Sequence, residues 1–360
     1  MSVERATVEV YEERAGEWRA GRSGQHVEAA ERFAATVEPG AVRVDLGCGP
    51  GFHLPALGRP VVALDAARSI LDLARDAAPG AWLVQADLEA PPFRDRSLGG
   101  AWARASYLHV PRVLLPLALA RLHWVLTPGA PFVVYVRLGD QEGALAEDGD
   151  FPGRFFAEWR EEGLRDVLVG AGFDVAEIFE DRGHRAEFLV ARARRARSLP
   201  DSVGGDMRVL VCGLNPSLYA ADRGVGYARP GNRFWPAARA AGLIVRDRDP
   251  LDALLSHGVG MTDLVKRATR SAAELGAPEY VVGVGRLERL VGWLRPRVVC
   301  FVGLTGWRAG IDRRAAAGLQ PQGFAGVPAY VMPSTSGANA HAQIGELTAH
   351  LRAVRALAER

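Results

Sequence analysis

Short runs of mainly apolar residues, each followed by glycine, aspartate or small polar residues, recur along this chain. They occupy residues 42–46, 60–64, 81–86 and 131–136 in the first half and residues 209–212, 298–302 and 327–332 in the second. Continuous apolar runs of this length, such as residues 209–212 and 298–302, are typical of strands that are buried on both faces, as in parallel sheets. The pattern therefore predicts an α/β chain in which helices cover both faces of each sheet.

The length of the chain exceeds the usual size of a single domain. Its 360 residues, 48% of them hydrophobic, provide for two cores. Residues 191–206 form a basic run followed by Pro, Ser and Gly, a composition typical of an interdomain linker. We predict two three-layer α/β/α domains, at residues 1–192 and 207–360, joined by a linker at residues 193–206.

The formal net charge of +2 hides a difference between the two halves. Residues 201–360 hold 20 Lys and Arg against 13 Asp and Glu, a net charge of +7, and residues 1–200 hold 24 against 29, a net charge of −5. Excess positive charge on one domain is the expected footprint of a surface that binds DNA phosphates. A small excess is also common in proteins that bind no nucleic acid, so the charge alone leaves both interpretations open.

The cysteines and the apolar segments bear on the cellular compartment. Cys48, Cys212 and Cys300 lie in or beside apolar runs and have no spacing typical of a metal site or a disulfide framework. The first residues lack the apolar core of a signal peptide, and no apolar run approaches the roughly 20 residues of a membrane span. We therefore expect a cytoplasmic protein without a metal.

A glycine-rich turn, Asp45-Leu-Gly-Cys-Gly-Pro-Gly51, follows the first predicted strand. Glycines at such a turn let a ligand approach the backbone closely. The second strand ends in Asp65, twenty residues after Asp45, where a carboxylate is placed to hold ribose hydroxyls, and the third ends in Asp87-Leu88. These three strand ends predict a nucleotide site formed by Asp45, Gly47, Gly49, Gly51, Asp65, Asp87 and Leu88.

The order of these acidic residues and glycines resembles the class I S-adenosylmethionine-dependent methyltransferases over about residues 1–195. The resemblance implies a Rossmann-like fold with S-adenosylmethionine as cofactor; the alternative is a fold that kept the turns and lost the cofactor. The methyl acceptor stays open, because residues 103–109 carry neither the Pro-Pro motif of base-amino methyltransferases nor the Pro-Cys of cytosine-C5 enzymes. His109 is either a general base or a structural side chain.

The first apolar run of the second half ends in Gly213-Leu-Asn-Pro-Ser217. Asn215 would then lie past the carboxyl end of a buried strand, where open α/β sheets bind ligands, and Pro216 stiffens the turn that presents it. A plain turn is the alternative interpretation of these five residues. Further motifs lower the odds of a plain turn, and they follow in this order: Tyr227, Asn232-Arg-Phe-Trp235, Thr262-Asp-Leu-Val265 and Pro333-Ser-Thr-Ser-Gly-Ala-Asn339.

This ordered set resembles the mismatch-specific uracil/thymine-DNA glycosylase family over about residues 207–355. The resemblance implies a uracil-DNA glycosylase fold with a central parallel sheet. It also implies a monofunctional enzyme that hydrolyses the N-glycosidic bond of uracil in DNA, at G·U mismatches or as related damaged pyrimidines, without a cofactor. The alternative function is a methyltransferase whose second domain only binds nucleic acid.

The same resemblance implies roles for individual residues. Asn215 positions the attacking water, and backbone amides at residues 213–217 stabilise the departing base. Tyr227 stacks on the extruded base, with a core tyrosine as the alternative, and Asn232 braces the first motif. Arg233 contacts a phosphate or a surface acid, and the serines of the last motif hold phosphates. The predicted base-binding residues are Gly213, Leu214, Ser217, Tyr227 and Asn232, and the predicted DNA-binding residues are Arg233, Ser334, Thr335, Ser336, Gly337, Ala338 and Asn339.

Ala338 departs from the family, whose members carry a bulky Arg or Leu that fills the gap left by the flipped base. Alanine has too little surface to fill that gap, so we expect a preference for uracil in single-stranded or weakly paired DNA. Asn339 becomes the polar wedge if the alignment shifts by one residue.

Overall fold

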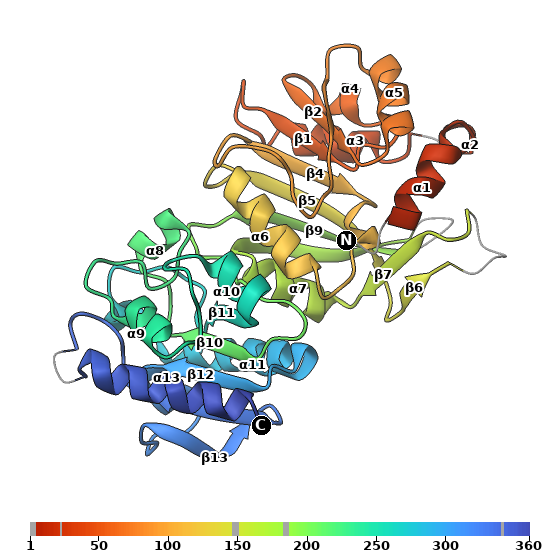
Figure 1. Cartoon of the computed structure of the whole chain (residues 1–360). Helices are drawn as coiled ribbons and strands as arrows, with labels where there is room; N and C mark the ends of the chain where they lie inside the picture. Colours follow the sequence, from red (N-terminus) through yellow and green to blue (C-terminus); the bar gives the residue numbers. More distant parts are fainter. Residues whose placement is uncertain (1–4, 22–23, 146–150, 183–186, 340–341) are drawn as a thin grey trace. The chain divides into compact units, whose positions relative to one another are not determined.

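The structure is a computed structural model that describes residues 5–21, 24–145, 151–182, 187–339 and 342–360. The chain divides into two compact units, Met1–Val169 with Phe173–Ala196, and Gly170–Gly172 with Arg197–Arg360. Each unit is an α/β domain, which confirms the fold class expected from the apolar runs (Figure 1).

The first domain is built on a sheet whose central strands are parallel. They have the order β3-β2-β1-β4-β5, with bounds β1 Arg43–Leu46, β2 Val61–Asp65, β3 Trp82–Gln85, β4 Gly100–Arg104 and β5 Pro131–Leu138. Further strands complete the sheet: β9 (Glu187–Arg195) pairs antiparallel with β5 and with β8 (Phe173–Arg182). β7 (Phe155–Trp159) pairs parallel with the end of β5 and antiparallel with β6 (Glu142–Ala144). The order reverses between β1 and β4, and such a reversal marks the crevice in which open α/β sheets bind ligands.

The helices of the first domain are α1 (Arg5–Glu13), α2 (Ala15–Ala20), α3 (Val27–Ala34), α4 (Leu54–Leu57), α5 (Arg68–Ala77), α6 (Leu115–Val125) and α7 (Glu161–Gly170). One core cluster joins Phe33 of α3 and Leu54 of α4 to Trp102 and Tyr135 of the sheet. The run at residues 81–86 differs from the expected buried strand. It forms β3 at the edge of the sheet, where Trp82 is 57% exposed.

The second domain has a central sheet of order β11-β10-β12-β14-β13. β10 (Val209–Gly213), β11 (Val259–Asp263), β12 (Val298–Val302) and β14 (Val327–Met332) are parallel, and β13 (Gly318–Phe324) is antiparallel to β14. Residues of β10, β11 and β12 are buried at every position, because helices cover both faces. The carboxyl ends of β10 and β11 therefore lie side by side, with Gly213 paired to Asp263.

The helices of the second domain are α8 (Leu218–Arg223), α9 (Phe234–Ala240), α10 (Pro250–His257), α11 (Ala277–Leu294), α12 (Leu304–Gly310) and α13 (Ile344–Ala358). On one face, Leu347, Leu351 and Val354 of α13 pack with Trp235 of α9 and with the sheet. Elsewhere, Phe301 of β12 makes edge contacts with Trp307 of α12 and with Phe324. Aromatic and aliphatic side chains thus fill the core that fixes the strand ends.

The stretch expected to be a linker is largely structured. β9 runs to Arg195, inside that stretch, and Ser198, Asp201 and Val203 are buried. Ser202 pairs with Met261 of β11 through two backbone hydrogen bonds, of 2.9 and 2.8 Å. Basic and Pro-Ser-Gly composition is therefore compatible here with a segment that adds to the sheet of the second domain.

The three cysteines are free thiols, and each is buried. Burial raises the pKa values of the Cys48 and Cys212 thiols well above the usual value for cysteine. It raises the pKa of the Cys300 thiol to about 12. Within the described part of the chain, the helices are too short or too polar to cross a membrane.

Candidate active sites

The glycine-rich turn of the first domain has the backbone shape that its glycines predict. Gly47, Gly49 and Gly51 have φ values of +68, +54 and +84°, a region that other residues rarely adopt. A Cβ atom on Gly47 would lie 2.4 Å from Cβ of Ser106, which follows β4. The turn therefore passes against the end of β4, and only glycine fits at position 47.

Asp65 shapes this turn. Its Oδ2 accepts a hydrogen bond from the backbone amide of Gly49 at 3.0 Å, and its Oδ1 accepts one from the amide of Ala67 at 3.0 Å. Burial raises the pKa of Asp65 to about 6, although these hydrogen bonds oppose the rise. Asp87 is exposed, and its Oδ1 accepts from the amide of Glu89 in the turn that also contains Leu88.

Polar atoms without partners collect at the ends of β1 and β4. Among the described residues, Oδ2 of Asp45 and Oγ of Ser106 are buried and have no hydrogen-bond partner. Burial, together with the charge of Asp65, raises the pKa of Asp45 to about 8. Buried polar atoms are nearly always hydrogen-bonded in folded proteins, so these atoms and the glycine cradle fit a polar ligand such as S-adenosylmethionine.

His109 follows β4 and belongs to a closed network. Its Nδ1 lies 2.6 Å from the carbonyl oxygen of Phe155, which only accepts, so Nδ1 carries the proton. Nε2 therefore accepts from the hydroxyl of Tyr11 at 3.0 Å, and that hydroxyl accepts from Nη1 of Arg154 at 3.0 Å. Burial lowers the pKa of His109 to about 4. Both ring nitrogens are used within the domain, which favours the structural role over the general base.

In the second domain, the side chain of Asn215 is held at the carboxyl end of β10. Its Nδ2 donates to Oγ1 of Thr269 at 2.8 Å, to the carbonyl of Arg267 at 3.0 Å and to that of Pro216 at 3.2 Å. The loop around it is also paired, because Leu264 and Val265 donate to the carbonyls of Gly213 and Leu214. With the amide nitrogen committed, the carbonyl oxygen of Asn215 is the group left for a ligand or a water. Thr269 was missed from the sequence, although a threonine four residues after a strand-end motif is a recognisable signal.

Tyr227 lies beside this loop. Its ring stacks on Phe234 of α9, with centroids 4.3 Å apart and planes 25° apart. Its backbone has φ +58°, and Nε1 of Trp235 donates to the neighbouring Gly226 carbonyl at 2.8 Å. The ring is therefore fixed from one side, and the stacking partner seen here is Phe234.

The structure gives three predicted site residues local structural roles. Ser217 caps α8, with Oγ accepting from the amide of Ala220 at 3.1 Å. Oδ1 of Asn232 accepts from the amide of Phe234 at the start of α9, so it braces its own helix and not the first motif. Arg233 donates to the carbonyls of Ser336 at 2.7 Å, Asn339 at 2.6 Å and Ala342. Nη1 and Nη2 of Arg233 therefore hold the last motif and Ala342, and contact of Arg233 with a DNA phosphate stays a prediction.

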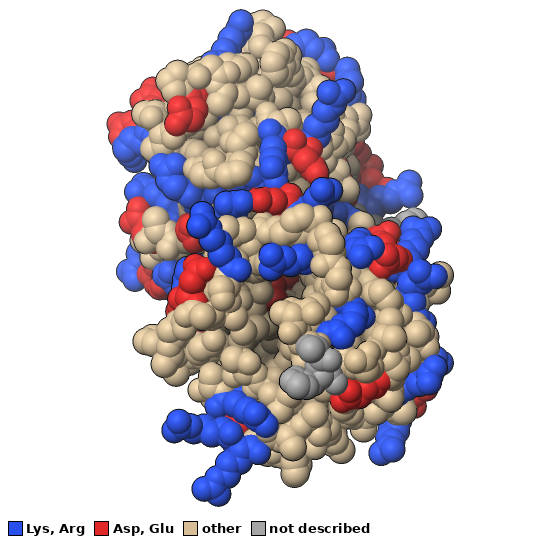
Figure 2. Space-filling view, turned by 90° about the vertical axis from the view of Figure 1, so that its left-hand side faces the viewer, with Lys and Arg blue, Asp and Glu red and all other residues tan. Residues whose placement is uncertain are grey.

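The last motif, residues 333–339, forms a loop after β14 that is closed by its own hydrogen bonds. Oγ of Ser334 and Oγ of Ser336 accept from the amides of Ser336 and Ala338, each at 3.3 Å, and Nδ2 of Asn339 donates to the carbonyl of Ser334 at 2.9 Å. Thr335 is buried, whereas Ser336, Gly337 and Ala338 are exposed. Figure 2 faces the side on which α8 and α9 lie in Figure 1, and the surface of the second domain is hollowed there.

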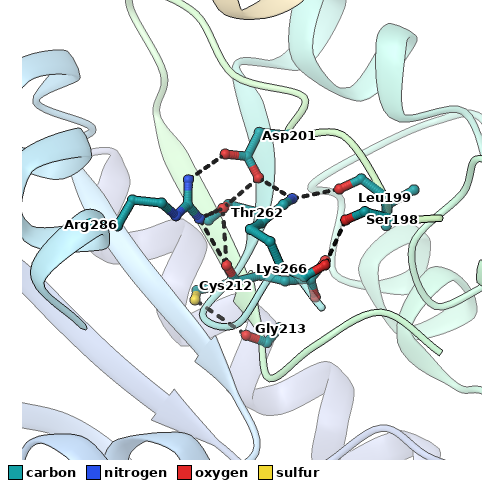
Figure 3. Close-up of polar contacts among 9 residues, drawn as sticks. Ser198, Leu199, Asp201, Cys212, Gly213, Thr262, Lys266 and Arg286 are labelled. Atoms are coloured by element: carbon teal, nitrogen blue, oxygen red, sulfur yellow. Dashed lines mark hydrogen bonds and ion pairs between the residues drawn. The ribbon is translucent and has the colours of Figure 1, made fainter. Parts of the chain in front are cut away.

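A buried ionic cluster, which the sequence did not reveal, lies next to the end of β11 and includes its residue Thr262 (Figure 3). Asp201 accepts from Nζ of Lys266 at 2.6 Å, from Nη1 of Arg286 at 2.8 Å and from Oγ1 of Thr262 at 2.7 Å. Burial raises the pKa of Asp201, but Arg286 and Lys266 outweigh it and hold that pKa below its usual range. Nη2 of Arg286 also donates to the carbonyl of Asp263 at 2.9 Å. The cluster thus anchors the segment before β10 to the end of β11.

Comparison with known families and structures agrees with the presence of two different domains in this chain. Residues 200–357 match the sequence model of the uracil DNA glycosylase superfamily, and residues 44–134 match that of a methyltransferase domain.

Similar solved structures include a SAM-dependent methyltransferase from Methanosarcina mazei, at 17% identity and TM-score 0.41, covering 46% of this chain and 97% of that one. Another is the 1,6-didemethyltoxoflavin-N1-methyltransferase of Burkholderia thailandensis, at 22% identity and TM-score 0.42, covering 54% and 92%. A SAM-dependent methyltransferase from Mesorhizobium loti matches at 21% identity and TM-score 0.38, covering 47% and 96%.

Proposed function

We propose that this chain, which carries a methyltransferase domain followed by a domain of the uracil DNA glycosylase superfamily, is a DNA repair glycosylase. The second domain hydrolyses the N-glycosidic bond of uracil, or of a related damaged pyrimidine, in DNA. It acts at G·U mismatches or in more open substrates, forms no covalent intermediate and leaves an abasic site.

The arrangement of Asn215 carries this proposal. Three acceptors hold its Nδ2, so its carbonyl oxygen has a fixed direction and accepts a hydrogen bond from the attacking water. An amide is too weak a base to remove a proton in the ground state. Rate acceleration therefore comes from placing the water and from stabilising the departing base, which favours bases that leave as stable anions, uracil above all.

The substrate must reach this site outside the helix stack. Extrusion of a nucleotide costs roughly a few kcal/mol, and least at a mismatch or lesion. Tyr227, held against Phe234, offers its ring to the extruded pyrimidine, and the hollowed surface of the second domain receives the strand. The excess of basic residues in the second half attracts DNA phosphates.

The monofunctional mechanism has support from the only lysine of the chain. Lys266 is buried, and its Nζ donates to Asp201 and to the carbonyl of Leu199. An amine held as an ammonium ion in a buried pair is a poor nucleophile. Formation of a Schiff base with the sugar would first require the cluster in Figure 3 to come apart.

The first domain binds S-adenosylmethionine and transfers its methyl group to an acceptor molecule. Asp45, Asp65, Asp87, Leu88 and the glycine turn hold the cofactor, which supplies an electrophilic methyl group when bound. The closed network of His109 with Tyr11 positions the segment after β4 and leaves His109 no free nitrogen for a proton.

An alternative is a methyltransferase whose second domain only tethers DNA. A tether needs basic side chains, but it needs no amide fixed at the end of β10. The deciding experiment incubates the full chain with a duplex that holds one G·U pair and then cleaves abasic sites with alkali. Strand cleavage at the uracil supports the glycosylase, and an intact strand with retained DNA binding supports the tether.

A further inference from the structure

Two polar groups meet over Gly213 at the carboxyl ends of paired strands. A Cβ atom built on Gly213 would lie 2.3 Å from Oδ1 of Asp263 and 3.0 Å from Oη of Tyr227. Gly213 pairs with Asp263 across β10 and β11, so the carboxyl group and the phenol face the same small space. Glycine is needed here because any side chain would fill that space.

Neither group has a partner within the residues that the structure describes. The hydroxyl of Tyr227 is buried and makes no hydrogen bond there. The carboxyl of Asp263, in a residue only 8% exposed, makes no hydrogen bond or ion pair there either. Two such groups around Gly213, two residues before Asn215 in the chain, are the expected lining of a site that binds a polar ring.

The buried ionic cluster explains why no cation pairs with the carboxyl group of Asp263 among the described residues. The charges of Lys266 and Arg286 act on this carboxyl group, but both side chains pair with Asp201, at 2.6 and 2.8 Å (Figure 3). Asp263 itself gives only its backbone carbonyl to Arg286. Burial therefore raises the pKa of Asp263 to about 6, since Lys266 and Arg286 compensate only part of the cost and Asp201 adds to it.

We infer that Asp263 acts in its neutral form, donating a hydrogen bond to a carbonyl oxygen of the base that the enzyme releases. This inference rests on the proposed glycosylase function and names the group that selects the base. Asp263 thus favours bases with a carbonyl oxygen at this edge, as in uracil, over rings that present only an amino group.

The charge that develops on the departing base determines whether a neutral or an ionised carboxyl group speeds the reaction. The bond between C1′ and the base nitrogen breaks with its electron pair on the base, and water forms the new C1′–O bond and gives up a proton to solvent. Negative charge spreads onto the carbonyl oxygens of the base, so a hydrogen bond from a neutral carboxyl strengthens as the bond breaks. A carboxylate at the same place would repel that charge. Asp263 keeps its proton, and the free base takes its own from solvent.

The other charged and titratable groups that face Asp263 come from several parts of the second domain. Burial raises the pKa values of Tyr227 and of Cys212 on β10 far above neutrality. Asp201, Lys266 from the loop after β11 and Arg286 from α11 stay ion-paired. Asp263 is therefore the group of this site that changes charge between about pH 5 and 7.

The first test is the pH profile of single-turnover excision from single-stranded uracil DNA by the full chain. We expect the wild-type rate to fall roughly tenfold per pH unit above about pH 7. Asp263→Asn, whose amide donates at every pH, should give a flat profile and exceed wild type at high pH. Asp206→Asn, the same change at an exposed site, should follow wild type. A wild-type-like slope in Asp263→Asn overturns the inference.

A second test does not depend on excision. Calorimetry of free uracil binding near pH 7, in two buffers that differ in ionisation enthalpy, measures protons taken up on binding. We expect uptake approaching one proton in wild type and none in Asp263→Asn. Equal uptake in both proteins, or none in either, overturns the role of Asp263. If the proposed function alone fails, excision is absent at every pH while this proton uptake persists.

Discussion

Nδ2 of Asn215 donates a hydrogen bond to Oγ1 of Thr269 across 2.8 Å, joining the end of β10 to the loop that follows β11. Asn215→Ala removes the amide that directs the water, so we expect excision to fall by roughly 100-fold or more while DNA affinity stays nearly unchanged. Single-turnover excision and filter binding measure the two effects. Turnover like that of wild type would refute the assignment of Asn215.

Thr269 allows a finer test of the same contact. Thr269→Val keeps the shape and loses the acceptor, so the Asn215 amide has more rotational freedom and excision should fall by about tenfold. Thr269→Ser keeps the hydroxyl and should stay close to wild type. Equal rates in the two variants would show that the hydrogen bond has no part in positioning.

Borohydride should trap no covalent adduct between the protein and uracil DNA. The reason is that Lys266 is buried and paired with Asp201. The measurement is gel electrophoresis of the reduced reaction mixture, beside a bifunctional glycosylase as positive control. An adduct that disappears in Lys266→Ala would overturn the monofunctional mechanism.

Asp201→Asn should destabilise the second domain strongly. The change leaves Lys266 and Arg286 buried without a counter-charge, for which a loss of about 3–5 kcal/mol is expected. Hydrogen exchange read by mass spectrometry resolves β10 and β11 from the first domain. Asp222→Asn, which weakens a surface pair with Arg197, is the matched control, and equal protection in both variants would contradict the prediction.

Asp65→Ala should weaken binding of S-adenosylhomocysteine by roughly tenfold or more. The carboxylate both orients the amide of Gly49 and offers charge-assisted hydrogen bonds to ribose hydroxyls. Titration calorimetry on the full chain measures the affinity, with Asp72→Asn, at a half-exposed side chain of α5, as control. If wild type gives no heat on titration, the first domain has a methyltransferase fold without the proposed cofactor binding.

Ala338→Arg should raise excision from a G·U duplex relative to single-stranded uracil. Ala338 is exposed in the loop after β14 and has too little surface to fill the gap in a duplex. Single-turnover rates on both substrates, for wild type and variant, give the ratio. If wild type already prefers the duplex strongly and the variant changes neither rate, the missing side chain is unimportant.

The parts of the fold that local patterns predict are those buried by their neighbours in the sheet. The runs at residues 209–212, 298–302 and 327–332 became β10, β12 and β14, because continuous apolar runs suit strands covered on both faces. The run at 81–86 is also mainly apolar and became the edge strand β3. Local composition does not reveal the position of a strand within its sheet.

The site residues likewise include some that local sequence patterns predict and others that they do not. The strand-end position of Asn215 followed from the break in an apolar run, and so did the glycine turn of the first domain. The contacts of Arg233 did not, because its acceptors are backbone carbonyls more than 100 residues away, and any sequence supplies those. Asp201 was assigned to a linker, since its partners Lys266 and Arg286 are 65 and 85 residues distant.

The burial of every thiol has a practical meaning for experiments on the protein in solution. Maleimides react with accessible thiolates, and Cys48, Cys212 and Cys300 offer none under native conditions. A cysteine introduced at position 338 would then be the single point at which a dye attaches, with no need to remove native residues. A fluorophore there would lie in the loop proposed to approach the flipped nucleotide, so its emission would report the opening and closing of the base pair in real time.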